Sequence, residues 1–408
     1  MRRVVITGIG GITALGHDWP TIEANLRAGR TGIRRMDDWE RYADLHTRLG
    51  APVTYFAAPA HYPRRAVRSM GRVALMSVRA SEMALADAGL LGDATIKDGR
   101  MGIAYGSSAG SVEPVRAFGH MLDTGSMAEV TSTTYIQMMS HTSAVNVGLF
   151  FGLKGRVIPT SSACTSGSQA IGYAYEAIRF GRIDMMLAGG SEELSALDAA
   201  VFDTLFATST KNDTPELTPR PFDARRDGLV VGEGAATLVL EELEYARARG
   251  ARIYAEVVGF GCNSDGAHIT QPEAATMAAA MDLALKDAGL PASAIGYINA
   301  HGTATDRGDI AESKATAQVL GNRVPIASLK GHFGHTLGAC GAIEAWLAIE
   351  MMRSGWFAPS ANLDQVEPEC AELDYIMGSG RELQTEYVMN NNFAFGGINT
   401  SLVFRRMA

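Results

Sequence analysis

The stretch Ser161-Ser162-Ala163-Cys164-Thr165-Ser166-Gly167-Ser168 is the part of the chain that best indicates its fold. It follows an apolar, strand-like run and precedes a helical pattern over residues 170–180, which Gly181 ends. A cysteine among small residues at a strand-to-helix turn faces the positive end of the helix dipole. This position is expected to lower the pKa of the Cys164 thiol and leave its sulfur free to attack. Taken alone, Cys164 is equally typical of a small buried hydrophobic residue.

The composition is that of an ordinary globular protein. The chain has 408 residues, of which 47% are hydrophobic and 20% charged. A net charge of -8 argues against nucleic-acid binding. We find no signal-peptide pattern and no apolar run of about 18 residues, so no membrane span is expected. The cysteines do not form a disulfide framework, and we expect a reduced, cytoplasmic location; they are Cys164, Cys262, Cys340 and Cys370.

Apolar β-branched runs alternate with helical patterns, which predicts an α/β fold with a largely parallel sheet. The pattern occurs twice, so we predict two similar halves, residues 1–250 and 251–408, with the functional site where they meet. The charged segment 242–252 connects them, and no flexible linker separates them. The paired stretches are 4–8 and 255–261, 103–107 and 297–303, the cysteine turn and 330–341, and the closing strands 236–241 and 402–404.

Two further regions are interpreted from their residue types. Residues 31–66 and 105–145 are rich in Arg, Met, Ser and Thr and are expected to be irregular insertions. The stretch 8–13 (Gly-Ile-Gly-Gly-Ile-Thr) half resembles a dinucleotide-binding fingerprint but lacks its third glycine. A tight strand-to-helix turn is the favoured interpretation of these glycines.

Three later motifs accompany the cysteine turn. The first is His301-Gly302-Thr303-Ala304-Thr305, placed where a strand is predicted to end. The second is Lys330-Gly331-His332-Phe333-Gly334-His335, a glycine-punctuated turn before an apolar helical pattern. The third runs from Asn391 to Asn399 and reads Asn-Asn-Phe-Ala-Phe-Gly-Gly-Ile-Asn. A thiol and two histidine motifs together point to nucleophilic chemistry on a carbonyl compound.

In this order the four motifs resemble those of the β-ketoacyl-acyl carrier protein synthases, class I/II, which are elongating condensing enzymes of the thiolase superfamily. The resemblance extends from Val4 to Phe404. It implies a thiolase-like α/β fold with duplicated halves in five layers (αβαβα). It also implies an acyltransferase that performs a decarboxylative Claisen condensation in fatty acid or related polyketide elongation. The two substrates would be an acyl thioester held on Cys164 and malonyl-acyl carrier protein, and no cofactor or metal is implied.

The chemistry explains why such an enzyme needs these residues. A cysteine thiolate can take the acyl chain as a new thioester, and loss of CO2 from a malonyl thioester creates the carbanion without a strong base. We expect Cys164 to carry the acyl group and the neutral imidazoles of His301 and His335 to donate to the thioester oxygen. The resemblance implies that Lys330 organises the second histidine and that Glu344 holds the network.

Further roles come from the resemblance alone. The backbone N–H of Phe395, with that of the nucleophile, would form the oxyanion hole, and the Phe395 ring would gate access. Thr303 and Thr305 would hydrogen-bond the pantetheine arm. Ala109 would meet the distal end of the acyl chain, with Phe202 as the opposing wall. A methyl group at that position predicts that medium to long chains are accepted, although turn packing also accounts for Ala109.

Two partners are implied by the same resemblance. An acidic acyl carrier protein would dock on Arg64, Arg65 and Arg68, with Arg72 one turn further on. A solvated charged helix face is the alternative for these arginines. A second copy of the chain would pair through the strand-like segment 155–160, giving a homodimer.

The sequence departs from the family pattern at several positions. Ala394 stands where glycine is usual and is expected to stiffen the gating loop, because alanine resists positive φ. Asp306 replaces a common proline, Ile398 a common threonine, and His332 is an extra imidazole. Cys340 occupies a small-residue position on a packed helix and is interpreted as a spectator.

Some residues, and the class of enzyme, have alternative interpretations. Asp265 and His268 are interpreted as support for the site, and Glu192 with Glu193 as core residues, a metal pair being the alternative. A degradative thiolase needs a second catalytic cysteine in a glycine-rich turn, which Cys370 does not occupy. Initiating Cys-His-Asn enzymes place asparagine where this chain has His335. A chain-length partner subunit would lack the nucleophile, and a binding protein would leave Cys164 unreactive towards alkylation.

Overall fold

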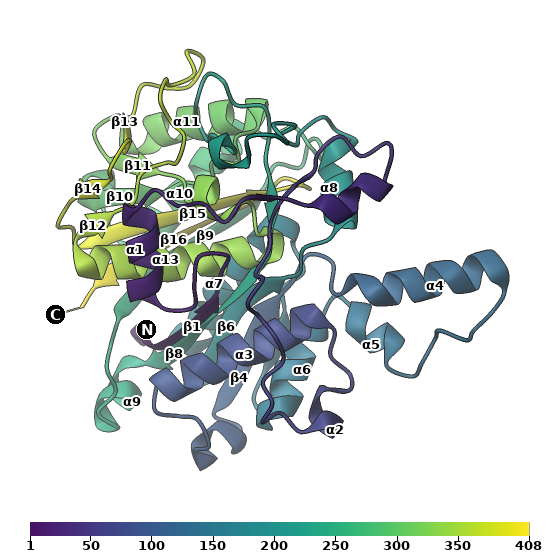
Figure 1. The fold of residues 1–408 in the computed structure, drawn as a ribbon. Helices are drawn as coiled ribbons and strands as arrows, with labels where there is room; N and C mark the ends of the chain where they lie inside the picture. The colour runs from purple at the N-terminus through teal and green to yellow at the C-terminus, as the bar shows by residue number, and fades with distance from the viewer. Residues whose placement is uncertain (408) are drawn as a thin grey trace.

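The structure is a computed structural model that describes residues 1–407. One continuous sheet of eleven strands runs through the molecule in the order β13-β11-β10-β15-β16-β9-β1-β8-β6-β4-β5 (Figure 1). Its strands are β1 (Val4–Ile12), β4 (Met101–Gly106), β5 (Val157–Pro159), β6 (Met185–Glu192), β8 (Gly234–Glu242), β9 (Ala255–Ser264), β10 (Ile295–Asn299), β11 (Pro325–Ala327), β13 (Asp374–Tyr375), β15 (Tyr387–Ala394) and β16 (Ile398–Arg406).

Helices cover the sheet in three layers. The pair α7 and α13 lies between the two halves of the sheet, α3 and α6 cover the outer face of the first half, and α10 and α11 that of the second (Figure 1). The predicted α/β fold with its five-layer arrangement is therefore confirmed, but the expectation of a largely parallel sheet is wrong. Five of the ten neighbouring strand pairs are antiparallel, because β1, β8, β9 and β16 run against their neighbours at the centre of the sheet. These helices are α3 (Arg72–Asp87), α6 (Thr142–Phe151), α7 (Ser166–Arg179), α10 (Ala274–Ala288), α11 (Asp306–Leu320) and α13 (Cys340–Ser354).

The remaining elements lie around these layers. Two small sheets are formed by β2 (Arg34–Arg35), β3 (Leu49–Ala51) and β7 (Val231–Gly232), and by β12 (Trp356–Phe357) and β14 (Arg381–Glu382). The short α-helices are α1 (Trp19–Arg27), α2 (Arg64–Val67), α4 (Val112–Thr124), α5 (Thr134–Met138), α8 (Ala196–Asp203), α9 (Leu243–Ala248) and α12 (Lys330–Phe333). The 3₁₀ turns are η1 (Asp37–Arg41), η2 (Ala94–Lys97), η3 (Ala163–Thr165), η4 (Pro215–Leu217), η5 (Ala292–Ala294) and η6 (Leu337–Ala339).

The two halves of the sheet repeat one topology. The order β1-β8-β6-β4-β5 corresponds to β9-β16-β15-β10-β11, and each pair of neighbours has the same parallel or antiparallel sense in both halves. The halves join where β1 pairs with β9, with Val4 opposite Val257. The stretches that repeat in the sequence fall on equivalent elements. Segment 242–252 contains α9, and Gly250 follows this helix with φ +70°.

The interpretation of the glycine stretch 8–13 as a strand-to-helix turn is wrong. Gly8 and Gly10 lie inside the buried strand β1, against which α3 packs. A Cβ on Gly8 would lie 2.3 Å from the carbonyl oxygen of Ala84, and one on Gly10 would lie 2.2 Å from that of Ala80. These glycines therefore let the helix backbone approach the strand directly, a packing role that local spacing does not reveal.

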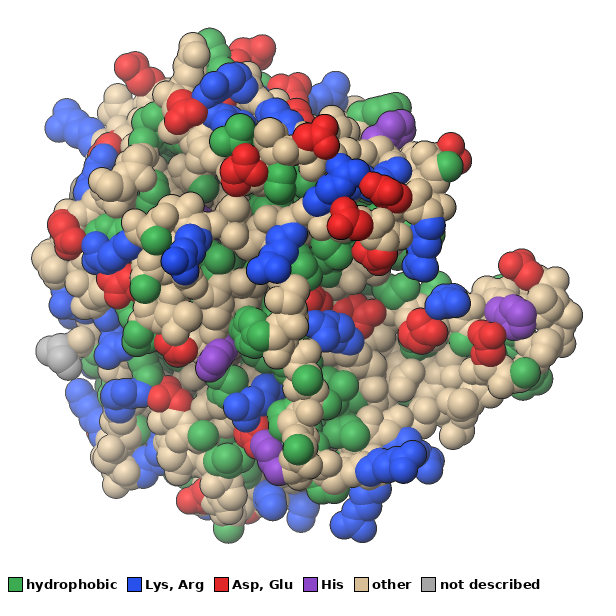
Figure 2. All heavy atoms as spheres, in the orientation of Figure 1, with side chains coloured by type: hydrophobic (Ala, Val, Ile, Leu, Met, Phe, Trp, Pro, Cys, Tyr) green, Lys and Arg blue, Asp and Glu red, His purple; other side chains and the backbone are tan. Residues whose placement is uncertain are grey.

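The expectation of irregular insertions holds for residues 31–66, apart from short elements, but not for 105–145. Helices α4 and α5 in the second region form an arm that extends away from the body of the molecule (Figures 1 and 2). The arm exposes Leu122 (79%), Met127 (67%) and Tyr135 (63%). Among the helices of residues 1–407, none is both long and apolar enough to cross a membrane.

Candidate active site

Cys164 lies in the turn η3, directly before α7, as the sequence predicts. Its side chain is buried, and the preceding residue, Ala163, has φ +50°, in the left-handed region that non-glycine residues rarely adopt. Side chains fix this turn locally: the Thr165 hydroxyl donates to Ser162 O (2.7 Å), and the Ser166 hydroxyl donates to Ala163 O (2.7 Å). The backbone that carries the sulfur is therefore rigidly held.

The expectation that the turn lowers the pKa of Cys164 is wrong for this structure. Burial raises the pKa of the thiol to about 12, although Lys330 and the backbone N–H of Phe395 pull it down. Desolvation of the thiolate is the larger effect because water has little access to the sulfur. The thiol is consequently neutral at rest, with backbone N–H groups of Phe395 and Cys164 itself directed at it.

The imidazoles of His301 and His335 lie next to the Cys164 sulfur. His335 Nε2 lies 3.0 Å from Cys164 Sγ, and the ring of His301 is 5.1 Å from that of His335. The backbone of His335 is fixed by the β7 segment, because its N–H donates to Val230 O (2.7 Å) and its carbonyl accepts from Gly232 N–H (2.9 Å). Burial holds the pKa of both imidazoles well below the ordinary value, so both are neutral.

The hydrogen-bond partners assign the tautomers. Lys330 Nζ lies 3.2 Å from His301 Nδ1, and the backbone N–H of Leu337 donates to His335 Nδ1 (3.3 Å). An ammonium and an amide N–H can only donate, so each Nδ1 accepts and the proton of each ring is on Nε2. His301 and His335 thus present N–H donors to the site, as required for stabilising a thioester oxygen.

Lys330 and Glu344 form a buried ion pair behind His301, and the Lys330 ammonium contacts a Glu344 carboxylate oxygen. Burial disfavours the charge on Lys330, but Glu344 outweighs it, and the pKa of Lys330 lies above its ordinary value. Asn392 Nδ2 donates to the other oxygen of Glu344 (2.7 Å). The lysine therefore keeps its charge and contacts His301 rather than His335, the imidazole that the resemblance assigned to it.

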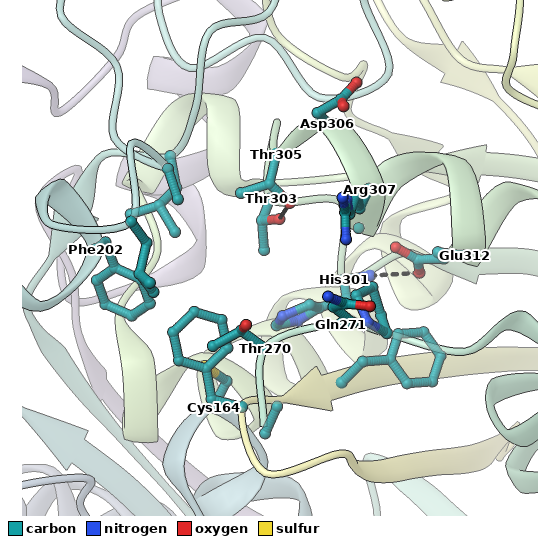
Figure 3. A pocket seen from close by; sticks show the side chains of 18 of the residues that line it. Cys164, Phe202, Thr270, Gln271, His301, Thr303, Thr305, Asp306, Arg307 and Glu312 are labelled. Atoms are coloured by element: carbon teal, nitrogen blue, oxygen red, sulfur yellow. Dashed lines mark hydrogen bonds between the residues drawn. The ribbon is translucent and has the colours of Figure 1, made fainter. Parts of the chain in front are cut away.

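Glu312 is a site residue that the sequence interpretation missed. The backbone N–H groups of His301 and Gly302 each donate to its carboxylate (2.7 Å each), and Figure 3 shows the first of these bonds. Burial raises the pKa of Glu312 to about 8. The burial of Glu312 and Asp309 on α11 marks them as acceptors for backbone or charged groups, but this burial depends on the tertiary structure, and the sequence alone carries no comparable signal.

The site contains possible metal ligands, but its outer contacts favour hydrogen-bond donation. Cys164 Sγ and one nitrogen each of His301 and His335 lie within 4.8 Å of one another. A metal-binding histidine usually donates its other ring N–H to an oxygen. Here each Nδ1 receives a hydrogen bond instead, so a metal on Nε2 would require both tautomers to change.

A cavity of about 540 Å³ leads to the sulfur. Cys164 lies at its base, and Thr303 and Thr305 line it further out, with their hydroxyls 2.8 Å apart (Figure 3). Phe395 and Phe202 also line the cavity, with ring centres 5.1 Å apart. Ala109, the other predicted tunnel residue, is exposed and does not line this cavity in the single chain.

The departures from the family pattern have structural explanations. The positive φ values after β15 belong to Gly396 (+85°) and Gly397 (+71°), so Ala394 introduces no backbone strain. His332 is buried away from the site, with its ring nitrogens near Arg30 O (3.3 Å) and Pro359 O (3.0 Å). Asp306 is exposed and pairs with Arg226 (3.1 Å).

The residues expected to play a supporting role divide between cavity and core. Asp265 and His268 both line the cavity, and Asp265 accepts from Asn399 Nδ2 (2.7 Å). Glu192 and Glu193 are buried acceptors for separate loops. Glu192 binds Ser107, Ser108 and Gly338, whereas Glu193 binds Ser111 and Val112. These contacts account for the two carboxylates as structural residues.

The predicted basic docking residues are free on the surface. Arg64, Arg65 and Arg68 are exposed on or just after α2, in the region where Figure 2 shows Lys and Arg side chains below the arm. Arg72 is different because its guanidinium binds Glu233 in two places (2.9 and 2.8 Å). Arg72 therefore begins α3 with its charge paired, and its part in the docking patch stays a prediction.

A duplicated α/β sheet with a buried thiol and two neutral imidazoles where its halves meet defines a thiolase-fold enzyme. Family models describe residues 1–246 as "Beta-ketoacyl synthase, N-terminal domain" and residues 254–364 as the corresponding C-terminal domain. The chain belongs to the β-ketoacyl synthase family.

Individual relatives agree along the full length of the chain. The 3-oxoacyl-[acyl-carrier-protein] synthase 2 of Vibrio cholerae serotype O1 is 37% identical, and the match covers 100% of this chain and 99% of that protein. A β-ketoacyl synthase from Burkholderia phymatum STM815 is 69% identical, with a TM-score of 0.99 and full coverage of both chains. A type II polyketide ketosynthase in complex with its acyl-carrier protein is 31% identical, with a TM-score of 0.87 and full coverage of both chains.

Proposed function

We propose that this protein is a 3-oxoacyl-acyl carrier protein synthase that elongates an acyl chain by decarboxylative condensation with malonyl-acyl carrier protein. The observation that carries the proposal is one constellation: a buried thiol 3.0 Å from His335 Nε2, with both imidazoles neutral and donating into the same cavity. Acyl transfer needs the thiol, and carbanion formation needs the two donors.

In the first half-reaction, Cys164 Sγ attacks the carbonyl carbon of the acyl thioester. The developing oxyanion accepts hydrogen bonds from the backbone N–H groups of Cys164 and Phe395, which point towards the sulfur. The carbon–sulfur bond to the carrier then breaks. Because Cys164 starts as a neutral thiol, its proton leaves with the carrier thiol, and the acyl group remains on the enzyme.

In the second half-reaction, the malonyl arm enters along Thr303 and Thr305, whose hydroxyls line the cavity. The Nε2–H groups of His301 and His335 donate to the malonyl thioester oxygen. Loss of CO2 leaves the electron pair on the adjacent carbon, which attacks the acyl carbon on Cys164. The 3-oxoacyl chain leaves on the carrier, and the Cys164 thiolate takes up a proton.

The test is to incubate the purified protein with an acyl-loaded and a malonyl-loaded carrier protein. We expect CO2 release and a carrier-bound chain two carbons longer, detected by mass spectrometry, with an acyl adduct on Cys164 before malonyl is added. Acylation without elongation would contradict the proposal and favour simple acyl transfer. Absence of any adduct would contradict the assignment of Cys164 as nucleophile.

The carrier protein is proposed to dock on Arg64, Arg65 and Arg68, which are exposed on or just after the short helix α2. An acidic carrier would be steered to this patch by long-range attraction. Reversing Arg65 and Arg68 to Glu should raise the KM for the carrier, and added salt should have the same effect on the native protein. The matched control is Arg323→Glu. Arg323 is exposed in the loop between α11 and β11, so this change should leave the KM unchanged.

A homodimer is proposed through β5, which is the last strand at one edge of the sheet. An exposed strand edge is a site for pairing with another chain, and Val157 on this edge is 48% exposed. Light scattering should give about twice the chain mass of 43.3 kDa. A fully active monomer at micromolar concentration would contradict this arrangement.

The acyl chain is proposed to extend past Phe202 towards Ala109, so that medium and long chains are accepted. Ala109 is exposed in the single chain, so this end of the tunnel would be enclosed only by the partner subunit of the proposed homodimer, where a methyl side chain would leave space. Ala109→Phe should therefore cost little with short primers and much with long ones, because overfilling a packed tunnel is sterically unfavourable. An equal loss at every chain length would assign the loop a folding role instead.

A further inference from the structure

Cys340 is not the spectator that its small-residue position suggests. It is the first residue of α13 and is 1% exposed. Its thiol donates a hydrogen bond to the carbonyl oxygen of Cys164, with 3.2 Å between the sulfur and the oxygen. The hydrogen bond joins the start of α13 to the backbone of the residue that would carry the acyl group. The two helices lie side by side between the halves of the sheet (Figure 1).

A second contact orients this thiol. Asn392 Nδ2 lies 3.7 Å from Cys340 Sγ and 2.7 Å from Glu344 Oε2. An amide N–H that approaches the sulfur occupies its lone pair and leaves the S–H free to point at the Cys164 carbonyl. Burial, chiefly, raises the pKa of Cys340 well above its ordinary value, so the thiol keeps the proton that it donates.

The contacts of Cys340 continue to the second histidine motif. Asn392 binds Glu344, Glu344 binds Lys330, and Lys330 contacts His301 Nδ1 (3.2 Å). All the residues of this contact network, from Cys340 to His301, are buried. Cys340 therefore connects the network behind the imidazole donors to the strained turn that holds the oxyanion donor.

We propose that Cys340 is a positioning residue, whose S–H holds the Cys164 carbonyl and so restricts the φ and ψ rotation of Cys164 that would turn its backbone N–H away from the acyl oxyanion. The inference rests on the proposed function, because it assigns the thiol to one half-reaction of the condensation. The turn has Ala163 at φ +50° and needs contacts that hold it there. Acylation depends on that N–H, whereas malonyl decarboxylation depends on the two imidazoles.

The test compares the two half-reactions in variants of Cys340. Acylation of Cys164 is measured in single turnovers by intact-protein mass spectrometry, and decarboxylation by CO2 release from malonyl-carrier protein. Cys340→Ala should slow acylation by about 3- to 10-fold at an unchanged KM, since one buried hydrogen bond is lost. Its decarboxylation rate should stay within about 2-fold of the native protein. Cys340→Ser keeps a donor of similar size and should restore acylation.

Cys370→Ala is the matched control, because it also removes a buried thiol (8% exposed) but lies in the core of the second half, outside the cavity. It should leave both rates unchanged. The inference is overturned if Cys340→Ala acylates at the native rate, if Cys340→Ser is as slow as Cys340→Ala, or if both half-reactions fall equally. If Cys340→Ala does not fold, a slow but folded Cys340→Ser still overturns it. A native protein that performs neither half-reaction would instead refute the proposed function.

Discussion

The two turns that start α7 and α13 are equivalent in the duplicated fold but are used differently. Each is a 3₁₀ turn whose first residue has positive φ, Ala163 (+50°) in η3 and Leu337 (+47°) in η6. The second residue is Cys164 in one turn and Gly338 in the other. The same backbone therefore presents a nucleophile in the first half and no side chain in the second.

The hydrogen-bond partner of the backbone N–H at the second residue explains the difference between the two turns. Gly338 N–H donates to the buried carboxylate of Glu192 (3.0 Å), whereas the N–H of Cys164 is directed at its own sulfur in the cavity. A Cβ on Gly338 would lie 2.8 Å from Glu192 Oε2 and 2.7 Å from Ser108 N. One turn is thus closed by a carboxylate of the protein, and the other is left open for an oxyanion of the substrate.

Of the changes that test this difference between the turns, removal of the nucleophile should have the largest effect on the reaction rates. Cys164→Ala makes the first turn as unreactive as the second, and acylation and condensation should both fall by at least about 10³-fold. Intact-protein mass spectrometry with an acyl carrier measures the adduct. An adduct on Cys262, Cys340 or Cys370 in this variant would contradict the asymmetry between the turns.

The next largest effect should come from the imidazole that faces the open turn from the second half. His301→Ala removes one donor to the malonyl thioester oxygen but leaves the oxyanion hole intact. We expect an acylated Cys164 that elongates about 10²- to 10³-fold more slowly, measured by product formation in single turnovers. Near-native elongation by this variant would mean that the second half contributes no donor to the chemistry.

The carboxylate that closes the second turn makes stability depend on pH. Burial raises the pKa of Glu192 from 4.5 to about 7, and Asp198 adds to the shift. The native state therefore binds this proton more tightly than the unfolded chain does. The resulting stabilisation is present below pH 4.5 and is lost as the pH rises to about 7, by about 3 kcal/mol for this group.

Glu192→Gln tests this dependence because an amide mimics the protonated acid without titrating. Urea unfolding of both proteins at pH 5 and pH 8 gives the difference in free energy of unfolding. The variant should gain up to about 3 kcal/mol relative to the native protein at the higher pH. A difference that does not change with pH would show that Glu192 closes the turn without a shifted pKa.

Much of this architecture could be predicted from the sequence because it depends on local patterns. The alternation of strands and helices, the repeat, and the sequence context of Cys164, His301 and His335 are all visible in short stretches. The arm helix α4 was missed because the region 105–145 was judged by its composition as a whole. Within residues 112–124 apolar side chains recur every three or four positions, at Val112, Val115, Phe118 and Leu122, which is a helical pattern.

The predictions about the site that the structure contradicts concern contacts between segments that are distant in the sequence. The direction of the Cys164 pKa depends on burial by several elements, which outweighs the helix dipole that the sequence suggests. Cys340 touches Cys164 across 176 positions of sequence, and Lys330 contacts His301 across 29. No spacing rule reports such pairs, so the outer contacts of the site needed the tertiary structure.

The smallest effect should come from relaxing the turn that holds the nucleophile. Ala163→Gly removes the cost of a left-handed backbone at an alanine but also makes the unfolded chain more flexible. These two effects oppose each other, so the free energy of unfolding should change by less than about 1 kcal/mol. The freer turn should nevertheless hold the Cys164 N–H less firmly and slow acylation by about 2- to 5-fold, with decarboxylation unchanged. Single-turnover acylation and urea unfolding of the same preparation separate the two quantities. If acylation keeps its native rate, the conformation of Ala163 is not what distinguishes the open turn from the closed one.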